Sequence, residues 1–119
     1  MRIQVDGMDN LKRVLDSIPG AVRKAAHSEL VDITLDLQGR AQRLAPVDTG
    51  DLRGSGFSEV EDLDGTVGFT APYALRQHEM VEARHPKGGQ AKYLEEPFKQ
   101  NEDKYVKSMQ ERVRRAVEK

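Results

Sequence analysis

The chain has 119 residues, which suits one domain with a single core, and its 19 basic and 20 acidic residues leave a formal charge of -1. This near balance gives no global attraction to nucleic acid or to an anionic membrane, and the lack of cysteine excludes disulfides, thiolate metal ligands and cysteine nucleophiles. Because only 37% of the residues are hydrophobic and 33% are charged, we expect a small core that relies on partner subunits.

The N-terminal segment predicts a short strand and a short helix. Residues 2–6 alternate and end in Asp6-Gly7, the pattern of a strand followed by a turn. Residues 8–18 carry apolar side chains at spacings of three and four, which predicts a short amphipathic helix that Pro19-Gly20 ends. Residues 1–7 lack the apolar run of a signal peptide, and no segment approaches the about 18 apolar residues of a membrane span. We therefore expect a soluble protein that is not secreted by a conventional route.

A long helix is predicted over residues 21–44. At about 1.5 Å per residue the segment would extend about 36 Å, long for a domain of this size. Val31 and Leu35 widen its apolar stripe, so we expect the helix to face both its own sheet and something else. It should end before Pro46, since the residue that precedes a proline is pushed out of the helical conformation. The stripe itself consists of Val22, Ala26, Leu30, Ile33, Leu37, Ala41 and Leu44.

The segment after this helix contains Asp48-Thr49-Gly50, which has two incompatible interpretations. Asp-Thr-Gly is the signature of an aspartic protease half-site, and since two such aspartates share a proton, a chain with one copy would have to dimerise. The catalytic loop of those enzymes follows an apolar strand in a nearly all-β fold, whereas Asp48 follows a helix and Ala45-Pro46. We therefore expect no enzyme here.

The second interpretation is a structural helix-to-sheet motif, and it accounts for each residue. Pro46 stops the helix, Asp48 bonds backbone N–H groups in an Asx-type turn, Gly50 takes a positive φ, and Leu52 begins a strand. The residues assigned to this motif are Ala45, Pro46, Asp48, Thr49, Gly50 and Leu52.

A β-hairpin is predicted next. Residues 52–60 and 66–70 read as two strands around the acidic turn 61–65. Phe57 in the first strand and Val67 in the second lie between small residues, so each strand has one apolar face on which a helix can lie. The residues that follow, 73–79, fit either a third strand or a helical turn.

Residues 80–92 have no periodicity and contain Pro86-Lys87-Gly88-Gly89, which predicts a long exposed loop. The glycines and lysines do not have the spacing of a phosphate-binding loop, and no aromatic residue lies between Val81 and Lys92 to stack on single-stranded nucleic acid. We therefore interpret the segment as a flexible loop that docks a partner protein. The candidate docking residues are Arg84, His85, Lys87, Gly88, Gly89, Gln90 and Lys92.

The histidines do not form a metal motif. A zinc protease needs histidines at i and i+4 with a glutamate between them, whereas His78 and His85 are seven residues apart and lack a third ligand. We expect no metal and no cofactor, and interpret these two as surface or interface residues. His27, within the long helix, is expected to be partly buried or at an interface.

Residues 93–119 predict a C-terminal helix, most clearly after Pro97. From residue 99 onward there are seven basic and four acidic residues, whereas residues 51–64 hold five acidic and one basic, so we expect an acidic tip and a basic end. A small nucleic-acid- or protein-binding regulator that uses this basic helix is the alternative function. Acidic residues interrupt the basic cluster as on a solvated face, so we expect no sequence-specific nucleic-acid contact. The apolar positions are Leu94, Phe98, Tyr105, Met109, Val113 and Ala116.

Taken in order, these features resemble the tail-component family of long-tailed bacteriophages, which are minor virion proteins of the head-tail connection. The resemblance covers roughly residues 8–115, and residues 73–98 look like the branch of minor capsid proteins in phages and prophages of Gram-positive bacteria. One departure is Gln77-His78-Glu79-Met80, where many relatives carry a Glu-Phe-Gly-Thr-like element. The motifs are Arg43-Leu44-Ala45-Pro46-Val47-Asp48-Thr49-Gly50-Asp51-Leu52-Arg53, Ala71-Pro72-Tyr73-Ala74, His85-Pro86-Lys87-Gly88-Gly89-Gln90-Ala91-Lys92-Tyr93-Leu94-Glu95 and Pro97-Phe98.

The resemblance implies a single domain over residues 1–119 with an α+β fold: a small antiparallel β-sheet packed against one long helix, with a short N-terminal helix and a C-terminal helix. It implies a ring, often sixfold, at the junction of tail tube and head, and no catalytic residues. The expected partners are neighbouring head-completion, tail-terminator or tail-tube proteins. The expected location is the virion, after a soluble stage in the host cytoplasm.

Overall fold

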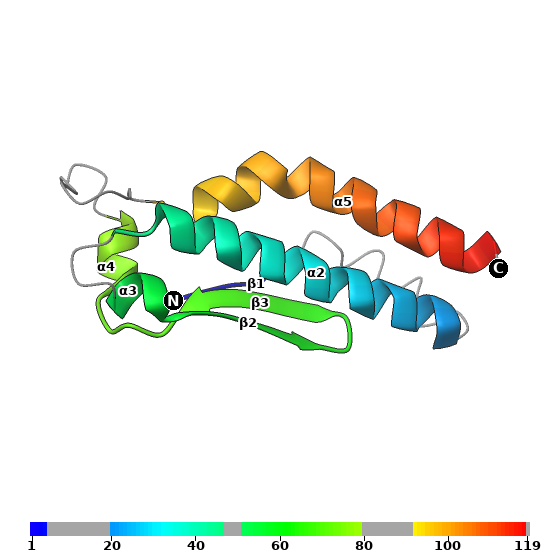
Figure 1. The fold of residues 1–119 in the computed structure, drawn as a ribbon, viewed down its shortest axis with the longest axis horizontal. Coiled ribbons are helices and arrows are strands. Elements are labelled where there is room, and N and C mark those ends of the chain that lie inside the picture. The colour runs from blue at the N-terminus through cyan, green and yellow to red at the C-terminus, as the bar shows by residue number, and fades with distance from the viewer. Residues whose placement is uncertain (5–19, 47–50, 80–91, 119) are drawn as a thin grey trace.

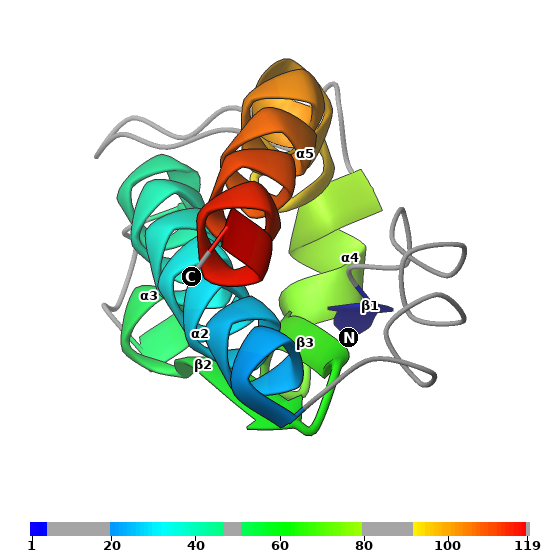
Figure 2. The same ribbon diagram turned by 90° about the vertical axis from the view of Figure 1, so that its right-hand side faces the viewer.

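A computed structural model describes residues 1–4, 20–46, 51–79 and 92–118 of the chain. The described part is elongated, 51 × 22 × 18 Å along its principal axes. Within it, the long helix α2 lies between a small sheet on one side and the C-terminal helix α5 on the other (Figures 1 and 2). The elements are β1 (Arg2–Gln4), α2 (Gly20–Leu44), α3 (Asp51–Gly54), β2 (Gly56–Glu61), β3 (Asp64–Phe69), α4 (Ala74–Glu79) and α5 (Glu95–Glu118).

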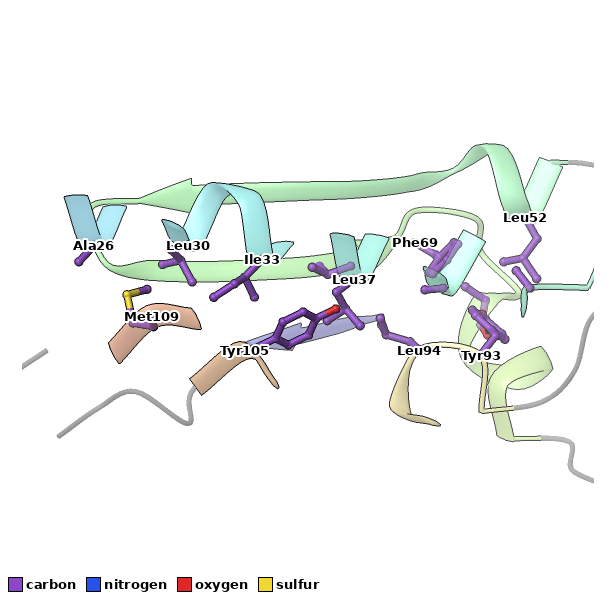
Figure 3. Packing of buried hydrophobic residues seen from close by; sticks show 14 of the residues in the cluster. Ala26, Leu30, Ile33, Leu37, Leu52, Phe69, Tyr93, Leu94, Tyr105 and Met109 are labelled. Atoms are coloured by element: carbon purple, nitrogen blue, oxygen red, sulfur yellow. Dashed lines mark hydrogen bonds between the residues drawn. The ribbon is translucent and has the colours of Figure 1, made fainter. Parts of the chain in front are cut away.

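Helix α2 confirms the long helix predicted from the apolar stripe. It ends at Leu44, two residues before Pro46, as the restriction on residues that precede proline requires. Its buried side chains fill the centre of the molecule, and Figure 3 shows Ile33 and Leu37 beside Tyr105 of α5. The buried residues of the predicted stripe are Val22, Ala26, Leu30, Ile33, Leu37 and Ala41, while Leu44 is partly buried.

The sheet has three antiparallel strands in the order β1-β3-β2. The strand predicted over residues 2–6 is confirmed for residues 2–4; the rest of that range is outside the described residues. The predicted turn over residues 61–65 is wrong in length, because Glu61 pairs with Asp64 and the turn contains only Asp62 and Leu63. Asp62 takes φ 53°, a left-handed conformation that aspartate tolerates better than most residues.

The face that each hairpin residue presents follows from this register. Phe57 pairs with Gly68, not with Val67, and directly paired residues share one face of a sheet. A Cβ on Gly65 would lie 2.9 Å from Thr34 of α2, so Gly65 faces the helix and Phe57 faces the opposite side. The expectation that Phe57 contributes to the helix-covered face is therefore wrong. Its ring instead lies under the guanidinium of Arg2, 5.6 Å from the ring centroid.

The last two helices complete the fold. Residues 74–79 form the helical turn α4, which decides between the two conformations that the sequence left open. Helix α5 confirms the predicted C-terminal helix. Pro97 lies in its first turn, where backbone N–H groups have no intrahelical acceptor, so the N–H that proline lacks is not needed there. The short helix predicted over residues 8–18 lies outside the described residues. None of the described helices is long and apolar enough to cross a bilayer.

Candidate docking interface

The helix-to-sheet motif is described in part. Ala45, Pro46 and Leu52 are buried, whereas Asp48, Thr49 and Gly50 lie outside the described residues. The prediction that Leu52 begins a strand is wrong. The Ser55 N–H donates to the carbonyls of Asp51 and Leu52, both at 3.1 Å, and so closes the helical turn α3, which directs the Leu52 side chain into the core.

Two polar residues that the sequence reasoning missed hold this junction together. The Nη2 group of Arg53 donates to the carbonyls of Arg43 and Ala45, each at 2.9 Å, at the end of α2 where carbonyls lack intrahelical donors. Gln42 Nε2 in turn donates to the Arg53 carbonyl at 3.1 Å. A basic residue that follows the end of a helix is the sequence signal from which this cap could be predicted.

The predicted docking loop lies mostly outside the described residues, which include neither Arg84, His85, Lys87, Gly88, Gly89 nor Gln90. The remaining candidate, Lys92, is engaged within the chain. Its backbone N–H donates to the His78 carbonyl at 2.7 Å, and its ammonium group pairs with Glu79 and, at 3.4 Å, with Glu95. Lys92 therefore joins α4 to α5 and differs in role from a free docking cation.

His78 lies at the centre of the same contact, and the prediction of a surface or interface histidine is wrong for it. The side chain is buried, with its ring 5.1 Å from the Tyr93 ring in an edge contact. Its Nε2 accepts the Glu95 backbone N–H at 3.2 Å, so the ring proton is on Nδ1, which donates to Glu79 Oε1 at 3.0 Å. His78 thus accepts a hydrogen bond from an N–H of the first turn of α5, which has no partner within the helix. Among the described residues, no group of three His, Asp or Glu side chains could hold a metal ion.

The charges in this contact shift one another's proton affinity. The hydrogen bonds from Lys92 and then His78 lower the pKa of the Glu79 carboxyl, and the bond to Glu79 raises the pKa of Lys92. Hydrogen bonds from Lys99 and Lys92 lower the pKa of Glu95. All three groups are exposed enough for water to screen them, so we regard the contact as an orienting device with a modest effect on stability.

The basic cluster of α5 is neutralised within the chain. Arg112 lies 3.3 Å from Glu29 of α2 and donates to Ser28 at 3.1 Å, while Arg114 and Arg115 both bond Glu111. The bonds from Arg114, followed by those from Arg115, lower the pKa of Glu111 to about 2. The end of α5 and the acidic hairpin turn point toward the same end of the molecule (Figure 1), so the two charged regions are not at opposite ends.

A hollow of about 440 Å³ lies between the first turns of α2 and the last turns of α5. The described residues that line it are three alanines and two arginines, namely Ala21, Ala25, Ala116, Arg112 and Arg115. Both arginines already pair with carboxylates, and the other lining residues are alanines. The described lining therefore holds no pair of an acidic and a basic group that could act together in catalysis.

No protein-family model, curated protein or solved structure matches this chain.

Proposed function

We propose that this chain is a structural virion protein of a tailed phage or prophage, acting in head-tail joining or tail completion by assembling into a ring at the connector-tail interface. The observation that carries the proposal is the order of three sequence elements along the chain. They are the helix end at residues 43–53, Ala71-Pro72-Tyr73-Ala74, and Pro97-Phe98. Each lies at a boundary of the fold: the end of α2, the start of α4 and the first turn of α5.

The surface of the described part also supports an assembly role. Leu35 and Leu75 expose more than half of their surface, at 54% and 57%, and Tyr73 beside Leu75 is also exposed. Single exposed apolar residues are common on monomers, but Tyr73 belongs to one of the family-like elements and Leu75 directly follows it. Subunits of a ring would cover such groups on assembly.

The contacts of α5 count against the regulator that was the alternative. A helix that binds nucleic acid presents its arginines to phosphates, whereas Arg112, Arg114 and Arg115 are bonded to Glu29, Glu111 and Glu118. Phosphate contact would first have to displace these carboxylates. We therefore propose neighbouring head-completion, tail-terminator or tail-tube proteins as partners, with the ring in the virion and the free chain in the host cytoplasm.

The proposal is tested by removing the gene from an inducible phage and complementing it. Without the protein we expect full heads and separate tails by electron microscopy, and a yield of infectious particles lower by several orders of magnitude. The wild-type chain should restore joining, and a chain that lacks residues 84–90 should stay folded but fail to restore it. The exposed-surface variant Lys107→Ala is the control and should complement fully. Normal particles without the protein would overturn the proposal, as would steeply salt-dependent DNA binding by a chain that forms no ring.

A further inference from the structure

Among the described strands, β2 lies at one edge of the sheet with no strand paired to its outer side. Glu61 and Asp64 flank a two-residue turn and so exchange hydrogen bonds, which means that Glu59 and Phe57 also bond to β3. The N–H and C=O groups of the alternate residues, Ser58 and Val60, therefore point away from the sheet. Within the described part of the chain only the Gly56 carbonyl on this side is occupied, by Gln38 Nε2 at 3.1 Å.

One stripe of α2 follows this edge from end to end. At the turn, Arg23 Nε donates to Asp62 Oδ1 at 2.9 Å, and His27 Nδ1 lies 2.6 Å from the Asp62 carbonyl oxygen. At the start of β2, Gln38 and Gln42 bond the carbonyls of Gly56 and Arg53. These four residues of α2 lie on one stripe whose members are three or four positions apart. Two further members of the stripe lie between His27 and Gln38. Those members are the apolar Val31, half-buried, and Leu35, 54% exposed.

The opposite side of the same edge is acidic. Glu59 and Glu61 are exposed and project from the face of the sheet that is turned away from α2, since they alternate with Ser58 and Val60. Neither carboxylate has an ion pair among the described residues. Within the described part of the chain, this edge is therefore bordered by an apolar ridge on one side and two exposed carboxylates on the other.

We propose that the β2 edge binds an extended segment of a partner protein in which apolar and basic side chains alternate. The backbone of the segment would pair with Ser58 and Val60, as in other strand-addition complexes. Its apolar side chains would cover Leu35 and Val31, and its lysines or arginines would lie beside Glu59 and Glu61. The inference deepens the proposed assembly role, and it rests on that role for the statement that the partner is a virion protein.

A second copy of β2 is a poor partner for this edge, because pairing would place like charges opposite each other. Two β2 strands that pair antiparallel with Ser58 opposite Val60 bring Glu59 against Glu59, and pairing of Val60 with Val60 brings Glu59 against Glu61. Like charges directly opposite each other destabilise a sheet. Pairing of Ser58 with Ser58 would place Val60 opposite Gly56, whose carbonyl is already bonded to Gln38. A basic partner strand avoids all three conflicts.

The test uses the full chain and two blocked octapeptides, one alternating Lys and Val and the other alternating Glu and Val. Binding is followed by amide and methyl shifts in NMR spectra at low and moderate salt. The Lys-Val peptide should shift the amides of Ser58 and Val60 and the methyls of Leu35, and should bind at least about tenfold more tightly than the Glu-Val peptide. Salt should weaken that preference.

Two variants separate backbone pairing from charge. Ser58→Pro removes an N–H that points away from β3, so the hairpin should be retained, as circular dichroism would check, and peptide binding lost. The double change Glu59→Lys with Glu61→Lys should reverse the preference, so that the Glu-Val peptide binds more tightly. Its matched control, Glu102→Lys with Asp103→Lys on the exposed face of α5, alters net charge equally and should leave the preference unchanged.

Three results would overturn the inference. The first is equal binding of the two peptides, or a preference that Glu59→Lys with Glu61→Lys leaves unchanged. The second is that the shifts map away from β2. The third is that the variant Val60→Cys forms a disulfide-linked dimer. Because the chain has no other cysteine, such a dimer would show that a second copy of the chain occupies the β2 edge. None of these results depends on phage joining, so the peptide test and the complementation test can fail independently.

Discussion

At the scale of single residues, Gly68 is the glycine of the described sheet at which an added Cβ would come closest to another backbone segment. A Cβ at this position would lie 2.5 Å from the Met1 carbonyl oxygen and 2.8 Å from the Phe57 ring, so a methyl group has no room unless β1 or Phe57 moves. Because Gly68 has no side chain, the Phe57 ring fits against it, and the Arg2 guanidinium lies 5.6 Å from the ring centroid.

We expect Gly68→Ala to lower the free energy of unfolding by about 1–3 kcal/mol, the usual cost of forcing extra volume into a packed site. Gly54→Ala is the matched control, because nothing lies within 4 Å of its would-be Cβ and the residue is helical. That change should be neutral or stabilise by about 0.4–1 kcal/mol. Urea unfolding of both variants checks this, and equal stability of the two would show that the Gly68 contact is not tight.

Two residues illustrate what the sequence could not predict at this scale. His78 looked like a surface histidine because its neighbours in the chain are polar, yet the groups that bury it, Tyr93 and the first turn of α5, come from more than a dozen residues away. The sequence places Arg53 in a predicted strand, and its role as the cap of α2 depends on α3 folding back on the helix end. Both depend on contacts between segments that the local pattern does not contain.

At the scale of elements, the contact between α4 and α5 combines backbone hydrogen bonds, the buried His78 ring and a small set of charges. Lys92 takes φ 54°, so a substitution that only removes its charge must tolerate the left-handed conformation. Asparagine does so better than other residues except glycine. Lys92→Asn therefore isolates the ion pairs with Glu79 and Glu95 from the conformation of the backbone.

We expect Lys92→Asn to lower the melting temperature modestly at pH 7. The difference from the wild-type chain should disappear at strongly acidic and at strongly basic pH. Glu79 and Glu95 have lowered pKa values, so their contribution is complete above the ordinary glutamate value of 4.5 and is lost as the pH falls through the folded-state pKa. Lys92 has a raised pKa, so its contribution is complete below 10.5 and is lost as the pH rises through the folded-state value. Melting curves across this range check the prediction, with Lys107→Asn as control; a pH-independent difference would contradict it.

The elements themselves were largely predictable. The apolar stripes of α2 and α5 are long enough that periodicity alone locates both helices, and the antiparallel hairpin is local in sequence. The side on which Phe57 lies was not predictable, because a turn of two residues instead of five changes which residues oppose each other. The turn is short because Asp62 adopts a left-handed conformation and is held there by Arg23 and His27 of α2.

At the scale of the whole molecule, α5 is attached mainly to α2, and the sheet contacts the other side of that helix. Its attachment consists of buried Tyr105 and Met109, a hydrogen bond of 2.6 Å from the Tyr105 hydroxyl to Asp36, and the pairing of Arg112 with Glu29. This arrangement predicts that α5 can open while α2 and the hairpin stay paired.

Hydrogen exchange measures such opening. The amides at the centre of α2 should exchange most slowly, and those of α5 faster, particularly toward its end. Met109→Ala should cost about 2–5 kcal/mol and accelerate exchange in α5 more than in β2 and β3, whereas Met109→Leu, with similar volume, should change little. The same acceleration in all elements would mean that the molecule opens only as one unit.

Of the two parts of the candidate interface, the apolar residues of α2 could be predicted from the sequence, whereas the β2 edge could not. Val31 and Leu35 widen the stripe of α2 in the sequence itself and so indicated a second contact surface. The open edge beside them depends on the strand order, in which the N-terminal strand pairs with β3 and leaves β2 at the margin. That pairing joins residues more than sixty positions apart, and local alternation carries no information about it.

The bond between the Lys92 N–H and the His78 carbonyl has one further consequence. It joins His78 and Lys92, which lie on either side of residues 80–91, and it uses no residue of that stretch. Doubling the length of such a connection costs only about 0.6 kcal/mol in chain entropy. Replacing residues 80–91 by another sequence is therefore expected to leave the bond between His78 and Lys92, and with it the contact of α4 with α5, in place.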